Sequence, residues 1–192
     1  HTVGSFTSEV IDLLQSQPEL IRQAAQRILG AHFPESLHPD LLEAVGLELD
    51  PDPRARSPRD RAFRERILTA YERRCAVCGL DMRLGAITIA IEAAHIKWHQ
   101  AHGPDTETNG LSLCSLHHKV FDFGGFTLDA GLRILVSTRL TGHGTFGDYI
   151  CRFHGQSIRL PNLPEHRPAT SFLDWHRREV FKGESRHLLH LK

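Results

Sequence analysis

Four side chains in two short segments have the chemistry of a tetrahedral metal site. Cys75 and Cys78 form a Cys-x-x-Cys pair, and Cys114 and His117 form a Cys-x-x-His pair. Paired thiol and imidazole ligands with this spacing are typical of zinc. Because four protein ligands leave no open coordination position, we expect a structural zinc that ties the two segments together. Two correctly spaced pairs disfavour the alternative that the cysteines are ordinary buried thiols.

A second, harder cation is indicated beside this site. His118 and Asp122 are one helical turn apart, so both side chains leave the same face of the helix expected there. A carboxylate favours Mg²⁺ or Mn²⁺, and an imidazole widens the choice to Mn²⁺, Co²⁺ or Ni²⁺. The spacing therefore predicts that these two residues hold a divalent cation.

Strands and a helix are needed to position these residues. Residues 86–91 are rich in β-branched side chains and predict a strand that leads into Ala94-His95-Ile96. Polar residues 97–108 predict a loop, residues 109–113 a second strand, and residues 116–123 a helix that Ser115 caps and two glycines stop. Strand, loop, strand and helix around a metal predict an α+β fold with a ββα-metal core.

Other elements flank this core. The chain divides into a helical segment (1–50), a proline-rich linker (51–58), a main domain (59–185) and a tail (186–192). In the first segment we expect a helix over 8–30, broken at Pro18 and capped by Gly30, and a helix over 40–45. A helix over 58–74 should place Phe63, Ile67 and Tyr71 on one face, and residues 126–129 and 133–137 should form a hairpin that turns at 129–131. A last helix over 170–182 should point Phe172, Trp175 and Phe181 inward.

The net charge of zero hides a segregation of charge. Residues 1–50 hold eight acidic and two basic side chains, a balance of −6, whereas residues 51–74 hold eight arginines against four acids, +4. Residues 75–151 carry −2, and residues 152–192 carry eight basic and four acidic groups, +4. Two basic segments around a metal site suit a polyanion such as DNA. A solvated, arginine-rich helix face is the alternative for either segment.

Cysteine usage and hydropathy bear on the compartment. No apolar run approaches 18 residues and no secretory signal is visible, so we expect neither a membrane span nor export. Three of the four cysteines have metal-ligand spacing and only Cys151 is left over. This favours a reducing compartment over disulfides, and we expect a cytoplasmic protein.

Residues 60–182 resemble the HNH nuclease domain, in the variant found in McrA-type, modification-dependent restriction endonucleases. The resemblance rests on Ala94-His95-Ile96, Asn109-Gly110-Leu111, the segment from Cys114 to Asp122, and Trp175-His176. Residues 10–50 are similar to the tail of a phosphorothioate-DNA-binding domain. We expect this acidic segment to be too short for a whole recognition module, so the chain by itself should bind DNA weakly and with little preference for modification.

The resemblance implies a metal-dependent DNA endonuclease. His95 would be the general base, and His118 with Asp122 would hold the catalytic cation at the scissile phosphate. Asn109 would bridge the loop and orient His95 through a side-chain hydrogen bond, although as a residue next to a glycine it could equally serve a turn. Without the resemblance, His95 would be unremarkable in a chain with 14 histidines.

One position departs from the family pattern. Many HNH enzymes place a metal ligand directly before the base, where this chain has Ala94. Glu92 could substitute through a water molecule, or it could be a surface carboxylate, and Glu107 is the weaker candidate.

Double-stranded DNA, modified or not, is therefore the expected partner. Phosphate contacts are expected from basic side chains, namely Arg59, Arg64, Arg73, Arg74 and Lys119. A homodimer is compatible with the sequence. The alternative function is a non-catalytic, zinc-stapled nucleic-acid-binding module, which would have no need of His95, His118 and Asp122 together.

Overall fold

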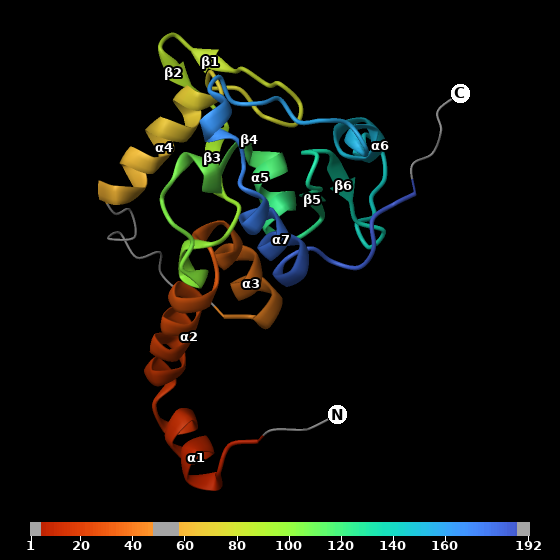
Figure 1. Ribbon diagram of the computed structural model, residues 1–192. Coiled ribbons are helices and arrows are strands. Elements are labelled where there is room, and N and C mark those ends of the chain that lie inside the picture. The colour runs from red at the N-terminus through yellow and green to blue at the C-terminus, as the bar shows by residue number, and fades with distance from the viewer. Residues whose placement is uncertain (1–4, 48–57, 188–192) are drawn as a thin grey trace. The chain divides into compact units, whose positions relative to one another are not determined.

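The computed structural model describes residues 5–47 and 58–187, with side chains from residue 61 onward in the second range. The chain forms two compact units, His1–Asp52 and Pro53–Lys192 (Figure 1). Helices together with short antiparallel strands confirm the predicted α+β class. Most of the expected linker and tail, residues 51–57 and 188–192, lies outside the described residues. Within the described ranges, no helix is long and apolar enough to cross a lipid bilayer.

The first unit is helical. It consists of α1 (Ser8–Ser16), α2 (Pro18–His32), the 3-10 helix η1 (Glu35–Leu37) and α3 (His38–Val45). The predicted break at Pro18 is confirmed, since this proline begins α2. The predicted helix end at Gly30 is wrong, because α2 continues to His32. Phe33 then becomes extended, as expected for a residue that precedes a proline.

A two-stranded antiparallel sheet and one helix form the centre of the second unit. Strand β3 (Ile91–His95) pairs with β4 (Gly110–Cys114) so that Ile91 lies opposite Cys114 and His95 opposite Gly110. Helix α5 (Ser115–Asp122) begins directly after β4 and contacts both strands (Figure 1). The order strand, loop, strand and helix is the predicted one.

The first strand of this core begins later than predicted. Residues 86–91 contain only the short strand β2 (Ile87–Thr88), which pairs with β1 (Arg83–Leu84) in a small hairpin. Ala90 has a φ of 56°, in the left-handed region that a strand cannot include. This residue separates the small hairpin from β3.

Helix α4 (Pro58–Ala70) covers the sheet. The predicted apolar face is confirmed, because Phe63, Ile67 and Tyr71 are all buried. A Cβ atom at Gly110 would lie 2.1 Å from Cδ1 of Ile67, so a glycine is needed where the helix closes on β4. The helix ends at Ala70, short of the predicted Arg74, because two of the residues that follow it have positive φ angles.

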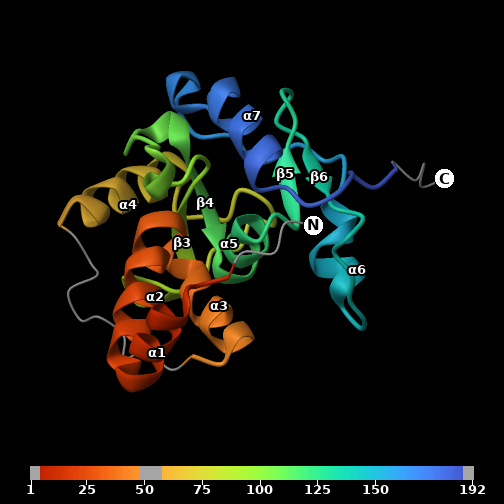
Figure 2. The same cartoon turned by 90° about the horizontal axis from the view of Figure 1, so that it is seen from below.

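A hairpin and a last helix complete the core. Strands β5 (Phe126–Leu128) and β6 (Ile134–Val136) pair as predicted, and Figure 2 shows them between α7 (Thr170–Glu179) and α6 (Phe146–Tyr149). Helix α7 buries Leu173 and His176, while the three predicted aromatic residues are half-buried and Phe172 packs against the core. Four 3-10 helices lie in the connections: η2 (His99–Ala101), η3 (Glu107–Asn109), η4 (Cys151–Phe153) and η5 (Pro164–His166).

Candidate active site and metal centre

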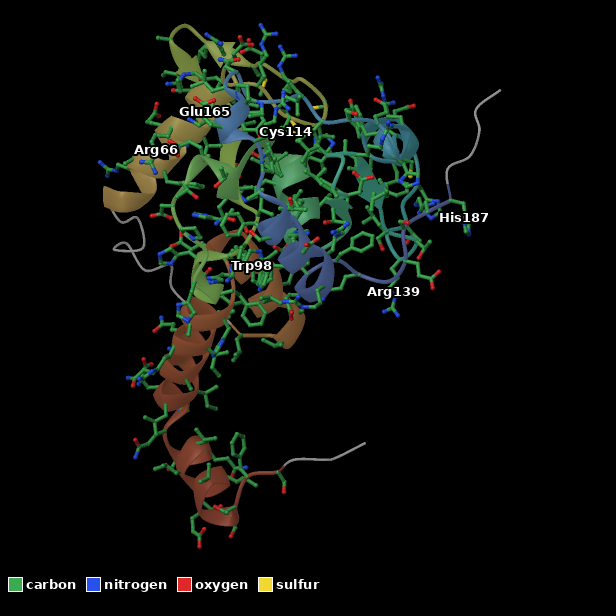
Figure 3. The ribbon with its side chains drawn as sticks, viewed as in Figure 1. Arg66, Trp98, Cys114, Arg139, Glu165 and His187 are labelled. Carbon is green, nitrogen blue, oxygen red and sulfur yellow. The ribbon has the colours of Figure 1, made fainter. Side chains whose placement is uncertain are left out.

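The four predicted zinc ligands meet in one cluster. The ligand atoms of Cys75, Cys78, Cys114 and His117 all lie within 4.8 Å of one another. The first pair comes from the turn after α4, Cys114 ends β4 (labelled in Figure 3), and His117 is in the first turn of α5. Three thiols and one imidazole in mostly buried positions are a donor set that fits zinc. The predicted grouping is therefore confirmed.

The ring of His117 is oriented for metal binding. Its Nε2 atom lies 2.9 Å from the carbonyl oxygen of Tyr149, which can only accept, so Nε2 donates its hydrogen. Its Nδ1 atom then points into the cluster, 3.0 Å from Sγ of Cys114 and 3.6 Å from Sγ of Cys75. A carbonyl behind the ring is the usual support of a ligating histidine.

The ionisable groups of this cluster shift one another's pKa values. Hydrogen bonds with Cys114 and Cys78 lower the pKa of Cys75, and the hydrogen bond with Cys75 raises the pKa of Cys114. Burial lowers the pKa of His117, but hydrogen bonds and charge from Cys75 and Cys78 outweigh burial and raise this pKa to about 9. A divalent cation would replace the proton on this ring.

A second cluster surrounds His118, the residue that follows His117 in α5. The His118 ring lies between two carboxylates, with Nδ1 2.6 Å from Oε2 of Glu92 and Nε2 3.1 Å from Oδ2 of Asp122. Glu92 also accepts a hydrogen bond of 2.6 Å from Ser115. The side chain of Asp122 is 2 % exposed and that of His118 15 % exposed. Both oxygens of Glu92 thus accept hydrogen bonds in the site, while its side chain stays 44 % exposed to solvent.

The charges of this second cluster depend on one another. Burial lowers the pKa of His118, but hydrogen bonds with Asp122 and Glu92 raise it to about 9 overall. The hydrogen bond from His118 in turn lowers the pKa of Glu92 to about 2. One imidazole and two carboxylates are donors that a hard or borderline divalent cation accepts. The fit is therefore chemically sound, with the protonated ring in the place of the cation.

His95 lies between Phe63 of α4 and Asp105 of the loop that follows β3. Its ring stacks on Phe63, with centroids 4.0 Å apart and planes 12° from parallel. Its Nε2 atom lies 2.9 Å from Oδ1 of Asp105, and its side chain is 20 % exposed. Asp105 was not singled out by the sequence, because its proximity to His95 arises only when the loop folds back on the strand.

Asn109 bridges the loop as predicted but acts differently on His95. Its Oδ1 accepts a hydrogen bond from the backbone N–H of Lys97, and its Nδ2 donates to the carbonyls of Lys97 and Pro104. Among the described residues these are the hydrogen bonds that its fully buried side chain makes. The predicted hydrogen bond from Asn109 to the His95 ring is thus replaced by the contact with Asp105.

Two other positions have clear structural roles. Ala94 has no side-chain donor atom at the position where many HNH enzymes carry a ligand, and its methyl group is completely buried. His176 is buried against Phe121, with centroids 3.8 Å apart, and its Nδ1 contacts Oγ1 of Thr127 at 2.9 Å. Burial lowers the pKa of His176 to about 4. His176 therefore packs α7 onto the core as a neutral side chain.

The expected phosphate contacts are largely paired within the protein. Arg64 bonds to the carbonyl of Ile91 at 3.0 Å, while Arg73 and Arg74 form ion pairs with acidic neighbours at 2.7 and 3.6 Å. Arg66, labelled in Figure 3, pairs with Glu107 at 2.9 Å. Lys119 lies beside His118 on α5, and the side chain of Arg59 is outside the described residues. These exposed pairs are weak enough to be exchanged for phosphate.

Comparisons with known proteins agree with this geometry. Residues 75–129 match the family model described as HNH endonuclease, and residues 1–50 match the one described as ScoMcrA-like, DNA sulfur-binding domain. The search of curated proteins gave no match. Among solved structures, a modification-dependent TagI restriction endonuclease aligns at 22 % identity with a TM-score of 0.47, over 72 % of this chain. The chain spans 42 % of the length of that protein. The resemblance stated from the sequence is confirmed, since residues 75–129 match the HNH endonuclease model and residues 1–50 match the DNA sulfur-binding model.

Proposed function

We propose that residues 59–185 form a nuclease domain that hydrolyses phosphodiester bonds of double-stranded DNA with the help of a divalent cation. The observation that carries this proposal is the contact of 2.9 Å between Nε2 of His95 and Oδ1 of Asp105, at the end of the strand that also carries Glu92. Strand β3 thus joins a candidate base to a candidate cation site, next to a structural metal cluster.

His95 acts as the general base in this proposal. Because the Asp105 carboxylate accepts the hydrogen of Nε2, the lone pair of the neutral ring is at Nδ1. The stack on Phe63 holds the ring plane fixed, which reduces the entropy lost when a water molecule is aligned for attack. Histidine suits this role because its ordinary titration range covers physiological pH.

His118 and Asp122 hold the divalent cation, with Mg²⁺, Mn²⁺, Co²⁺ and Ni²⁺ as the candidates. Such a cation supplies charge stabilisation at the scissile phosphate. The ring of His118 must first lose the proton that it now shares with Asp122, 3.1 Å from Nε2. Glu92 then accepts the remaining hydrogen from Nδ1 and keeps the ring in the orientation that presents Nε2.

Residues 1–50 contribute to DNA recognition, and residues 51–58 link them to the nuclease domain. The family match of this segment supports phosphorothioate DNA as the modification that is read. Its acidic character, with eight acidic and two basic side chains, opposes phosphate contact, so we expect little preference for modified DNA from this segment alone. Binding of the chain to matched duplexes with and without one phosphorothioate measures this preference directly.

The test of catalysis is nicking of supercoiled plasmid by the full chain, with each divalent cation and with EDTA. His95→Ala should slow nicking by about 10²–10⁴-fold without weakening DNA binding, because a base acts only in the transition state. His99→Ala is the matched control, since His99 is an exposed histidine whose ring lies edge-on to His95 at 6.3 Å. Metal-independent DNA binding without nicking would instead support the zinc-stapled binding module.

A further inference from the structure

A cavity of about 360 Å³ is lined by Lys119 and Val120 of α5 and by Phe123 at its C-terminal end, at helix positions that face away from His118. Val120, Phe123 and Leu140 give it an apolar floor, and Lys119, Arg139 and Lys182 surround that floor with positive charge. Its volume is at the small end of the range for ligand sites in proteins. An apolar surface ringed by cations matches one unit of a sugar–phosphate backbone.

The three cations come from three separate segments of the chain. Lys119 is on α5, Arg139 follows β6, and Lys182 follows α7. Like charges that converge on one cavity repel one another, and a bound anion removes this repulsion. Within the described residues, Arg139 and Lys182 have no ion-pair partner, in contrast to the paired arginines of α4.

Main-chain contacts fix the backbone at two of these residues. The backbone of Lys182 donates to the carbonyl of Gly124 at 3.0 Å and accepts a hydrogen bond from the hydroxyl of Ser137. The same hydroxyl accepts a hydrogen bond of 3.0 Å from the backbone N–H of Arg139. The Arg139 side chain lies at the surface (Figure 3) and runs along Gly183, where an added Cβ would lie 2.9 Å from its Cγ. The backbone from which each charged side chain extends is therefore fixed before any ligand arrives.

We infer that this cavity binds one phosphodiester group of the DNA backbone, with the adjoining sugar against Val120, Phe123 and Leu140. The inference rests on the proposed function for the identity of the ligand as DNA. The lining residues of α5 lie on the other side of the helix from His118, so the bound phosphate would be a different one from the scissile phosphate. The cavity would then fix the register of the strand without reading its sequence.

Binding of the full chain to a short duplex, without added divalent cation, tests this inference. Arg139→Ala and Lys182→Ala should each weaken binding roughly 10-fold and lower the slope of log affinity against log salt by about 1. Lys182→Arg should restore both quantities. Arg178→Ala, which removes an exposed cation from α7 outside the cavity, is the control and should have little effect. Equal losses in the control, or no loss in the cavity variants, would overturn the inference.

Neutral methylphosphonates placed singly along the duplex identify the bound phosphate. When the methylphosphonate replaces the phosphate that the cavity binds, its loss of binding free energy and that of Lys182→Ala should not add. At remote positions the two losses should add. Additive losses at every position would contradict a specific phosphate site. Because binding is measured without cleavage, a chain that shows this coupling but never nicks DNA keeps this inference and refutes the proposed function. A chain that nicks DNA but shows no such coupling refutes this inference and leaves the proposed function standing.

Discussion

Nε2 of His95 lies 2.9 Å from Oδ1 of Asp105, a residue of the loop that Asn109 holds against the end of the strand. This contact joins an element that the HNH pattern contains to a carboxylate that it does not. It also determines which nitrogen of His95 can accept a proton. The loop between the two strands is thus part of the candidate active site.

Substitution of Asp105 tests this relationship. His95→Ala should slow DNA nicking by about 10²–10⁴-fold, and Asp105→Ala should cause a substantial part of that decrease. The reason is that without Asp105 the His95 ring is no longer held in one tautomer and one orientation. The Michaelis constant and the zinc content should stay unchanged. The double variant should be no slower than His95→Ala alone, since residues that act as a unit are not additive. Additive losses in single-turnover nicking would show that Asp105 acts independently of His95.

The zinc cluster makes a separate prediction. Elemental analysis should find about one zinc per chain, and Cys114→Ser should lose both the zinc and the cooperative thermal unfolding of the nuclease domain. Cys151→Ser is the matched control, because Cys151 is a partly buried cysteine outside the cluster. A folded, zinc-free Cys114→Ser protein would contradict a structural role.

The raised pKa of His117, about 9 without metal, adds a pH dependence. Below this value the ring carries a proton that zinc must displace, so zinc affinity should fall as the pH falls. Calorimetric titration in buffers of different ionisation enthalpy should detect protons released at neutral pH. Zinc binding without proton release would contradict protonation of the whole cluster, since the Cys114 thiol must lose its proton as well.

The sequence predicts which residues form the two metal clusters better than it predicts the neighbouring groups that orient the functional side chains. Residue spacing is sufficient for the zinc ligands and for the pair of His118 and Asp122, because each spacing lies within one local element. Asp105 and the Tyr149 carbonyl could not be predicted, since their contacts depend on tertiary folding. The same limit applies to β3, whose start is set by the left-handed conformation of Ala90, for which residue type gives no signal.

Glu92 and His118 predict how stability depends on pH. The pKa of Glu92 falls from 4.5 to about 2 on folding. Its contribution to the free energy of unfolding is therefore present above pH 4.5 and lost as the pH falls through about 2. The pKa of His118 rises from 6.5 to about 9 on folding. Its contribution to the free energy of unfolding is therefore present below pH 6.5 and lost as the pH rises through about 9. The ion pair therefore stabilises the fold most between 4.5 and 6.5.

Thermal unfolding without divalent cation checks this window. Glu92→Gln should lower the unfolding midpoint at roughly pH 5.5, and the difference from the wild type should shrink at roughly pH 10. Glu165→Gln, which changes an exposed carboxylate elsewhere, should have little effect at either pH. A constant difference across this range would mean that Glu92 stabilises the fold by packing rather than through the charged ring.

Asn109 links the stability of the loop to catalysis. Asn109→Ala removes a buried side chain that makes hydrogen bonds of 2.8, 3.0 and 2.9 Å with the main chain of Lys97 and Pro104. The variant should lose roughly 2–4 kcal/mol of unfolding free energy, because the loop groups are left without their partner. It should also nick DNA more slowly while it retains zinc, since Asp105 belongs to the loop that is released. Thr106→Ala, an exposed change in the same loop, is the control for denaturant unfolding and for nicking. If Asn109→Ala unfolds like the wild type but fails to nick DNA, Asn109 acts directly on the reaction rather than through the loop.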